Sequence, residues 1–520
     1  MGAPVVKSTN GYGLPVTVVA SGGLPMEVAG NGYGTPIIEV AQGGLPVTYV
    51  GAAEPIPPPA LPLSSPKVMG FGHSFVLNGI QYLYNASNTA TNGASGVLTS
   101  GRGVLSLVEG LDGGRYNLDI FAEFSNIPPG FSIAGGQGYG GRQIARGGAG
   151  LKIWGAGITI DLNTVVDYLF ARAPDIVVID IGINDLIYAF TNGGTIEDVC
   201  SLYAAIVRRI RDRGIWCVLM TVTWSDTTAF PASNPTCVAW KQQLNDLILS
   251  LDGESGIRVC NTLSIDGQAT SIGSNPSNFF DTNLHPSDKL NIRRAEVLIP
   301  ILQSMTTVIE RRSLDELTGN LLPNPGLTGI TGTKTGTATT GDVATGMSFA
   351  GPNTGGTSSV VLSKEVISGS SEKQVISITN GAPGGTTSTA QLRVSTAATL
   401  AGLGLVAGDR LRWYASIELD DWAGWDFDGQ ADGPVKIQLP LNNGSTLVYQ
   451  GSNAASVRNR TLILTGILEI PQGLTVDGLR WNSTFITIRW NTNVAGTGVA
   501  KISKLKVVKM GENPRAPWNL

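Results

Sequence analysis

The sequence predicts a multidomain protein in which an α/β domain with a parallel sheet lies between short N-terminal β-repeats and a C-terminal β-sandwich of jelly-roll type. Three observations predict this architecture. Residues 67–310 alternate strand-like apolar runs with amphipathic helical runs. Residues 10–30 and 31–51 are two copies of a 21-residue repeat. Residues 320–520 are rich in Thr, Gly and Ser and carry many short alternating runs without convincing helices.

Length and charge limit the classes of function. At 520 residues the chain is too long for one hydrophobic core. Glycine accounts for 68 residues and only 14% of the residues are charged, a composition typical of turn-rich β structure. The net charge of −4 argues against a nucleic-acid partner, and no Lys/Arg cluster indicates an anionic membrane surface. We therefore expect a neutral ligand.

The first residues lack a basic segment followed by an apolar one, so we expect no signal peptide. No apolar run has membrane-spanning length, so we expect no membrane insertion. Four cysteines occur at no metal-site spacing and in no Cys-x-x-Cys pair: Cys200, Cys217, Cys237 and Cys260. Buried free thiols are the favoured interpretation, and one or two disulfide bridges are the alternative.

Each copy of the repeat divides into two short β-prone runs, which cannot bury a core without neighbours. We therefore predict that residues 1–52 form an oligomerisation or docking segment, with a flexible glycine-rich tail as the alternative. Residues 53–66 are proline-rich and predicted to be a semi-rigid linker. Residues 311–319 open with a charged run and are predicted to connect the α/β domain to the β-sandwich.

Within the α/β domain, residues 176–181 and 215–220 are predicted to be buried strands. Residues 195–213 are predicted to form an amphipathic helix, because Thr195 and Asp198 have the spacing of a capping box and a glycine follows. Further helices are predicted at residues 161–173, 232–251 and 287–308, the last one bent at Pro300.

Tryptophan is frequent in the predicted β-sandwich. Trp413 and Trp490 alternate within strand-like runs and are predicted to pack in its core. Trp422 and Trp425 stand among carboxylates, and contact with a sugar ring competes with core packing as their role. A calcium site competes with simple solvation for three nearby carboxylates, those of Asp426, Asp428 and Asp432.

A candidate nucleophile lies in Gly72-His73-Ser74, directly after an apolar run, where glycine permits a tight turn that exposes a serine hydroxyl. A serine nucleophile needs an imidazole base within hydrogen-bond reach, and the chain has only 2 histidines. The ring of His73 would tend to point away from its chain neighbour Ser74. This leaves His285, in Leu284-His285-Pro286-Ser287, as the candidate base.

Two further motifs stand between these, Gly138-Tyr139-Gly140-Gly141-Arg142 and Gly182-Ile183-Asn184-Asp185. Together, and in this order, the four motifs resemble those of the SGNH (GDSL-like) hydrolase superfamily over residues 67–310. The resemblance implies a flavodoxin-like, three-layer parallel sheet, a serine ester hydrolase and no cofactor. It also implies that Ser74 is the nucleophile, that His285 is the general base, and that the Gly141 N–H and the Asn184 amide stabilise the oxyanion, with the Ser74 N–H as a third donor.

Two positions depart from the family pattern. The family usually has Asp where this chain has His73, so this residue is a candidate for tuning substrate choice. The third member of the triad normally precedes the histidine by three residues, where this chain has Thr282. Asp281 would complete a triad if the loop is reshaped, and a Ser–His dyad is the alternative. Arg142 could contact an anionic group of the substrate or serve a structural ion pair.

The flanking regions suggest a setting for this activity. Residues 320–326 resemble the start of carbohydrate-binding-module-like jelly rolls, and the whole arrangement resembles a bacteriophage tail or neck appendage. This resemblance implies a homotrimer located in the virion, with its N-terminal repeats docked to other virion structural proteins. The resulting hypothesis is a carbohydrate O-acetylesterase that acts on the surface polysaccharide of a bacterial host. The alternatives are a non-catalytic virion fibre that binds glycan, and a lipid or thioester hydrolase.

Overall fold

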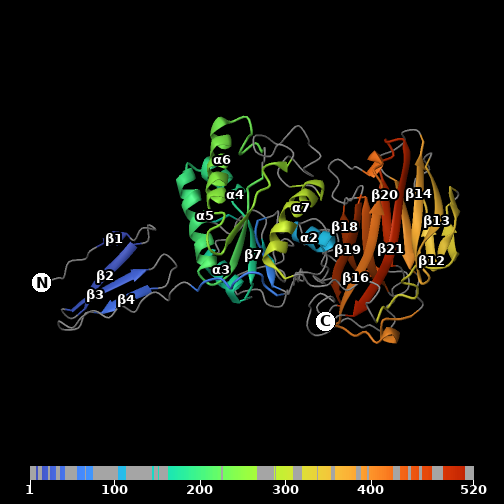
Figure 1. The fold of residues 1–520 in the computed structure, drawn as a ribbon, viewed down its shortest axis with the longest axis horizontal. Helices are drawn as coiled ribbons and strands as arrows, with labels where there is room; N and C mark the ends of the chain where they lie inside the picture. Colours follow the sequence, from blue (N-terminus) through green and yellow to red (C-terminus); the bar gives the residue numbers. More distant parts are fainter. Residues whose placement is uncertain are drawn as a thin grey trace.

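The computed structural model describes the greater part of the chain. The described residues are 7–9, 15–21, 24–30, 36–40, 56–64, 66–73, 104–112, 143–145, 150–151, 162–171, 173–223, 227–265, 286, 288–307, 319–336, 338–352, 358–381, 388–394, 398–425, 434–442, 447–455, 460–470 and 484–509. In the central part of the chain they form a parallel sheet with helices on both faces (Figure 1).

The parallel sheet has five strands in the order β6-β5-β7-β8-β9. The strands are β5 (Val68–Gly72), β6 (Gln143–Ala145), β7 (Ile176–Asp180), β8 (Trp216–Met220) and β9 (Ile257–Cys260). Every neighbouring pair is parallel. In chain order this is the sequence 2-1-3-4-5, the strand order of flavodoxin-like sheets. The predicted α/β class is therefore confirmed for this part of the chain.

Alternate residues of the strands supply two separate cores. Val177 and Ile179 pack in one apolar cluster, with helices α3 (Leu162–Ala171), α4 (Ile183–Thr191), α5 (Ile196–Arg211) and α6 (Pro235–Ser250). Ile176 and Val178 pack in the other, with helices α2 (Val104–Asp112) and α7 (Asp288–Met305). Burial on both faces explains why these strands are apolar throughout.

Helix α5 shows how local sequence sets an element. The Thr195 hydroxyl accepts a hydrogen bond from the Asp198 N–H at 3.1 Å, so the predicted N-cap is confirmed. The helix ends before Gly214, which has a φ of 77° and permits the turn into β8. The predicted helices of residues 161–173, 232–251 and 287–308 appear as α3, α6 and α7, and α7 contains Pro300.

The described part of the proline-rich linker is attached to the α/β domain. The Ile56 N–H donates to the Asp212 carbonyl at 2.9 Å, and the Trp216 indole N–H donates to the Pro59 carbonyl at 2.9 Å. Leu63 exchanges backbone hydrogen bonds with the end of α7. A spacer would leave these groups to water. Residues 56–63 instead run along the domain, so this part of the predicted semi-rigid linker is attached to it.

Four short strands precede this segment and form an antiparallel sheet in chain order. They are β1 (Lys7–Thr9), β2 (Pro15–Ser21), β3 (Leu24–Gly30) and β4 (Pro36–Val40). Strands β2 and β3 fall within the first copy of the repeat and β4 within the second. The three β-prone runs that the structure describes therefore do pair with one another. Their predicted role in docking or oligomerisation stays a prediction.

The C-terminal region consists of two six-stranded sheets that share one apolar core. One sheet has the order β10-β12-β15-β20-β17-β18 and the other β11-β13-β14-β21-β16-β19. The strands of the first are β10 (Thr331–Thr335), β12 (Val343–Ala350), β15 (Ser388–Val394), β20 (Thr484–Trp490), β17 (Val435–Asn442) and β18 (Leu447–Ala455). Those of the second are β11 (Thr339–Gly341), β13 (Ser359–Ser368), β14 (Ser371–Asn380), β21 (Gly496–Lys509), β16 (Arg410–Leu419) and β19 (Arg460–Glu469).

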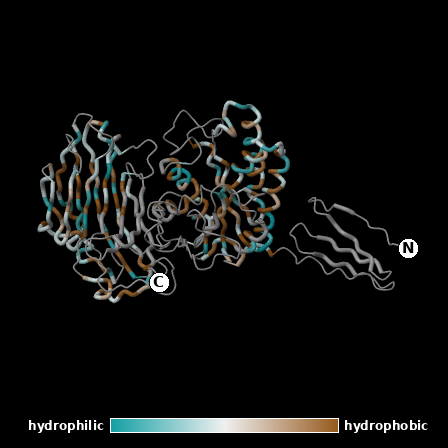
Figure 2. The backbone as a smooth tube through the Cα atoms, turned by 180° about the vertical axis from the view of Figure 1, so that it is seen from behind, coloured by the Kyte–Doolittle hydropathy of each residue, from teal (hydrophilic) through white to brown (hydrophobic). Residues whose placement is uncertain are grey.

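Trp413 and Trp490 are buried in the core between these sheets, as predicted. Figure 2 shows apolar stretches along the strands and polar ones along the outer helices of the α/β domain. Helix α2 contacts both α7 and β19, so it lies between the α/β domain and the C-terminal sheets (Figure 1).

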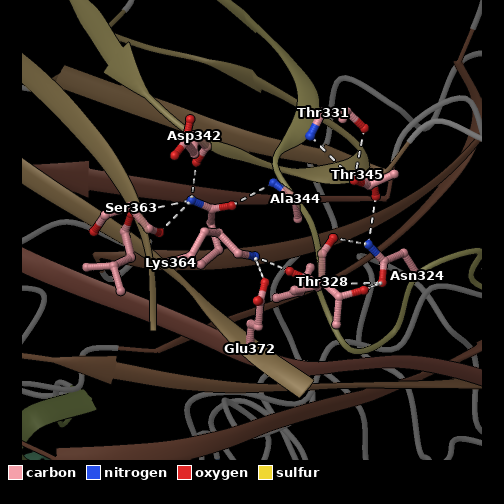
Figure 3. A network of polar contacts seen from close by, with 12 residues as sticks. Asn324, Thr328, Thr331, Asp342, Ala344, Thr345, Ser363, Lys364 and Glu372 are labelled. Carbon is pink, nitrogen blue, oxygen red and sulfur yellow. Dashed lines mark hydrogen bonds and ion pairs between the residues drawn. The ribbon is translucent and has the colours of Figure 1, made fainter. Parts of the chain in front are cut away.

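A buried polar network ties the first strands of the C-terminal region together (Figure 3). The Gln374 side chain is fully buried, and its carbonyl accepts from the Ala344 N–H at 2.9 Å. Its amide donates to the backbone carbonyls of Asp342 and Ser363 at 3.0 and 3.1 Å. The amide therefore satisfies backbone groups of both sheets.

Two further features bear on the class of protein. Among the helices of the described residues, none is long and apolar enough to cross a bilayer. All four cysteines are described and are free thiols, as the favoured interpretation expected, with Cys200 half-buried and the others buried.

We predict that Gln374→Leu lowers the free energy of unfolding of the C-terminal region by about 3 kcal/mol, because the buried Ala344 N–H and the part-buried carbonyls of Asp342 and Ser363 lose their partner. Urea denaturation followed by tryptophan fluorescence measures the change. Gln391→Leu on β15, whose amide oxygen accepts only from Arg393 at an exposed site, is the control and should change little. Equal losses in both variants would contradict the role given to Gln374.

Candidate active site

The candidate site lies where β5 and β7 end. The two strands pair in register from Val68–Ile176 to Gly72–Asp180, so their carboxyl ends reach the same level of the sheet. From β5 the chain crosses to β6 on one side, whereas β7, β8 and β9 lie on the other. Such a switch point leaves a crevice at the carboxyl ends of the strands, where open α/β sheets bind their ligands.

His73 is the first residue past β5. Its backbone N–H donates to the Asp180 carbonyl at 3.4 Å, which continues the pairing of β5 with β7 by one residue. Its side chain is only 1% exposed. This burial favours a packing role over direct contact with a substrate. Ser74 follows His73 in the chain.

Gly182 carries the chain from β7 into helix α4. Its φ of 126° is strained for other residues, and a Cβ there would lie 2.9 Å from the Leu244 side chain. Helix α4 begins at the next residue, so Asn184 lies in the first turn and is half-buried. N–H groups in a first turn have no partner within the helix and favour negative charge nearby. A neutral amide and a helix N-terminus thus stand together at the end of β7.

Asp185 connects α4 to the segment that follows β6. Its carboxylate is buried, and Oδ1 accepts the Leu151 N–H at 2.5 Å. A Cβ on Gly150 would lie 2.7 Å from the same oxygen, so only glycine fits without displacement. The segment after β6 is therefore held against the first turn of α4.

Asp180 and Arg294 form a buried ion pair at the end of β7. Arg294 Nη2 lies 2.7 Å from Asp180 Oδ2, and the side chains are 0% and 6% exposed. Arg294 also donates to the Asn291 side chain at 3.2 Å and lies 3.8 Å from the Met220 sulfur. The pair attaches α7, the helix that follows His285 in the chain, to the central strand of the sheet.

The β8 side of the site is fixed by helix α6. The Asn245 side chain accepts the Val222 N–H at 2.7 Å and donates to the Val222 carbonyl at 3.1 Å. Lys241 lies one turn earlier on α6 and is only 2% exposed. Burial lowers the pKa of the Lys241 ammonium to about 7. The Thr223 hydroxyl, past the end of β8, is fully buried and has no hydrogen-bond partner among the residues that the structure describes.

The structure describes part of the residues that the sequence singled out. His73 and Asn184 flank the switch point, one after β5 and one after β7. Five predicted site residues lie outside the described residues: Ser74, Gly141, Arg142, Asp281 and His285. Their roles stay predictions.

Gly150, which the sequence analysis did not single out, lies in this part of the site. Strand β6 begins at Gln143, two residues after Gly141, and its carboxyl end is Ala145, paired with Gly72. Gly150 follows the carboxyl end of β6 and lies against Asp185, beside Asn184 in the chain. Gly150 is therefore a second candidate, beside Gly141, for the glycine of the oxyanion site.

The two candidate sugar-binding tryptophans differ in burial. Trp425 is 0% exposed and its indole N–H donates to Asp420 Oδ1 at 2.7 Å, which favours a core role because a buried ring offers no free face. Trp422 is half-buried and packs edge-to-face on Trp425, with ring centroids 5.1 Å apart. It also lies against Gly498. Trp422 stays the candidate for a sugar contact.

Sequence reasoning missed four residues of the site: Gly150, Asp180, Asp185 and Arg294. A signal existed for Asp180, which is the one charged residue in an otherwise apolar strand. No local pattern marks Arg294 or Gly150, because their partners are 114 and about 35 positions away in the chain.

Within the described residues no group of three His, Cys, Asp or Glu side chains could hold a metal ion. The carboxylates considered for calcium, those of Asp426, Asp428 and Asp432, lie outside the described residues.

Comparison with known proteins gives one result that bears on function. Residues 130–291 match the model of the GDSL-like Lipase/Acylhydrolase family. This segment extends from ahead of β6 into α7 and includes Gly150, Asp180, Asn184 and Asp185. The match supports a GDSL-like hydrolase domain. No curated protein matches the chain.

Several solved structures show weaker likeness. An acetyl xylan esterase from Geobacillus stearothermophilus shares 16% identity with a TM-score of 0.31, covering 48% of this chain and 99% of that chain. Another acetyl xylan esterase shares 20% with a TM-score of 0.25, covering 31% and 79%. The enzymatically active domain of bacteriophage CBA120 tailspike protein 4 shares 9% with a TM-score of 0.20, covering 32% and 20%. Likenesses at these scores decide neither fold nor function.

We predict that Arg294→Met lowers the free energy of unfolding by about 3–5 kcal/mol, because it leaves the Asp180 carboxylate buried without its counter-charge. Adding Asp180→Leu should recover part of this loss, since the double variant buries no charge. Urea denaturation measures the wild type, Arg294→Met, Asp180→Leu and the double variant. Arg209→Met, which breaks the exposed pair with Asp167, is the control and should cost less than about 1 kcal/mol. A double variant as unstable as the sum of the single ones would show that the pair is not coupled.

We predict that Lys241 makes stability rise with pH. The folded pKa is about 7 and the ordinary value is 10.5, so between these values the unfolded chain binds more protons and the folded state gains. From pH 7 to 9 the wild type should gain about 2 kcal/mol relative to Lys241→Met. Urea denaturation at pH 6, 7, 8 and 9 measures the difference. Parallel pH profiles would contradict a titration of Lys241 near neutrality.

Proposed function

We propose that the protein is a serine ester hydrolase whose active site lies at the carboxyl ends of β5 and β7. One observation carries this proposal. The register of these strands brings the residue before Ser74 and the Asn184 turn to the same end of the sheet, at its switch point. The match to the GDSL-like Lipase/Acylhydrolase family supports the reaction class.

In the proposed reaction the Ser74 hydroxyl oxygen attacks the acyl carbonyl while His285 accepts its proton. The tetrahedral intermediate then expels the alcohol, which takes the proton from His285, and leaves an acyl-serine. Water, deprotonated by His285, attacks the acyl-serine and releases the carboxylic acid. Asp281 would orient His285 in a triad; otherwise the two residues act as a dyad.

Among the steps of the proposed reaction, the described residues contribute to the stabilisation of the oxyanion. The Asn184 amide can donate to it without adding charge, and the first turn of α4 adds a favourable dipole. The resemblance assigns a backbone N–H of Gly141 to the same task, and the contact of Gly150 with Asp185, beside Asn184 in the chain, makes the Gly150 N–H a second candidate. Donors of this kind contribute about 3 kcal/mol each to the stabilisation of a transition state.

We further propose that the acyl group is an acetyl ester on a carbohydrate, with the surface polysaccharide of a bacterial host as substrate. A small, uncharged acyl group agrees with the low charge of the chain. On this proposal Trp422 and the C-terminal sheets hold the glycan. The N-terminal strands would dock the protein, as a homotrimer, to other structural proteins of a phage virion.

The second candidate function is glycan binding without turnover, as part of a virion fibre. The observation that favours it is Trp422, a half-buried ring packed on Trp425 and Gly498, which suits stacking against a sugar. This function needs no contribution from Ser74.

Acetate release from 4-nitrophenyl acetate and from acetylated polysaccharide tests the proposal. We predict that Ser74→Ala and His285→Ala each lower kcat by at least about a thousandfold, because they remove the nucleophile and its base. Asn184→Ala should lower kcat by about a hundredfold with little change in KM. Trp422→Ala, with its site in the other domain, should spare the small ester. Undiminished hydrolysis by Ser74→Ala would overturn the mechanism, and an inactive wild type would favour glycan binding.

A further inference from the structure

The Asp185 carboxylate lies between the two groups that the proposed oxyanion site needs. It belongs to the first turn of α4, one residue after Asn184. It also contacts Gly150 and Leu151, which follow β6. Its chain neighbour Asn184 would supply one donor to the oxyanion, and Gly150, which contacts its carboxylate, would supply the other.

The contact is close and specific. Oδ1 of Asp185 accepts the Leu151 N–H, a charge-assisted hydrogen bond at a buried site. The same oxygen lies where a side chain on Gly150 would begin, so the Gly150 backbone rests directly against the carboxylate. The Leu151 side chain is buried in the apolar core with residues of α3 and α4, and this packing also holds Gly150 and Leu151 in place.

An oxyanion site stabilises the transition state only when its donors are already in place, because movement during the reaction would cost the energy that the donors provide. The backbone of Asn184 is placed by the turn at Gly182 and the start of α4. Gly150 follows β6, a strand of only three residues, in the chain. A contact that joins Gly150 to the first turn of α4 would set the distance between the Gly150 N–H and the Asn184 amide.

We propose that Asp185 is a positioning residue that fixes the Gly150 backbone relative to Asn184 and so sets the geometry of the oxyanion site. The proposal rests on the proposed ester hydrolysis. Asp185 does not touch the reacting atoms. It acts through the hydrogen bond to Leu151 and the contact with Gly150.

Asp185→Ala and Asp185→Asn test this role. Alanine removes the acceptor, and we expect kcat for 4-nitrophenyl acetate to fall by about ten- to a hundredfold with KM nearly unchanged. Asparagine keeps an oxygen that can accept the Leu151 N–H and should recover most of the loss. The matched control is Asp175→Ala. The Asp175 carboxylate accepts the Lys67 N–H at 2.6 Å, at the amino ends of β5 and β7, away from the candidate site. It should leave kcat unchanged.

Hydrogen exchange of the Leu151 amide gives a readout that does not depend on turnover. It should speed up in Asp185→Ala, stay slow in Asp185→Asn and be unaffected in Asp175→Ala. A double-mutant cycle adds a second check, since Gly150→Ala should lower kcat in the wild type and add little in Asp185→Ala, where the clashing oxygen is gone.

The outcomes separate this inference from the proposed function. An active wild type whose kcat and Leu151 exchange are unchanged by Asp185→Ala would overturn the positioning role and leave ester hydrolysis standing. Faster exchange with unchanged kcat would also overturn it, by showing that Asp185 holds the segment without serving catalysis. A wild type that hydrolyses no ester would overturn the proposed function, and the catalytic role of Asp185 with it.

Discussion

The parallel pairing of β5 with β7 is the constraint on which the candidate site depends. Because Gly72 pairs with Asp180, the turns after both strands begin at the same level, and the His73 N–H extends the pairing into the turn. A slip of one residue would exchange the faces of β5 and move its turn by about 3.3 Å along the strand. The two apolar cores on either side of the sheet oppose such a slip, since alternate residues of each strand belong to different cores.

Buried charge at this end of the sheet is costly, and two of the charged contacts have a structural use that offsets the cost. The Asp180–Arg294 pair attaches α7 to the central strand. The Asp185 carboxylate attaches the segment after β6 to α4. Loss of one partner of such a contact is strongly destabilising, so each contact favours the arrangement that keeps both partners together. This specificity suits a site whose donors must stand at fixed distances.

The sequence predicted the elements whose signal is local. Helix α5 follows from the Thr195 cap and its apolar spacing, and β7 and β8 follow from continuous apolar runs. The Gly-x-Asn-Asp turn was placed correctly at the end of β7 for the same reason.

Contacts between distant segments were not predictable in this way. The proline-rich residues 56–63 have the composition of a spacer, yet they run along the α/β domain because backbone groups near Asp212 and Met305 accept and donate there. Likewise, many glycines precede and follow β6 in the sequence, and nothing in the sequence indicates that Gly150 lies against Asp185.

The most direct test of the central claim is to label the protein with an alkyl phosphonate ester that reacts with activated serines, and to locate the adduct by mass spectrometry. The account predicts one adduct, on Ser74, which forms rapidly in the wild type, slowly in His285→Ala and not after unfolding in urea. An adduct on another residue, or no reaction of the folded wild type, would contradict an ester-hydrolysing site at the carboxyl ends of β5 and β7.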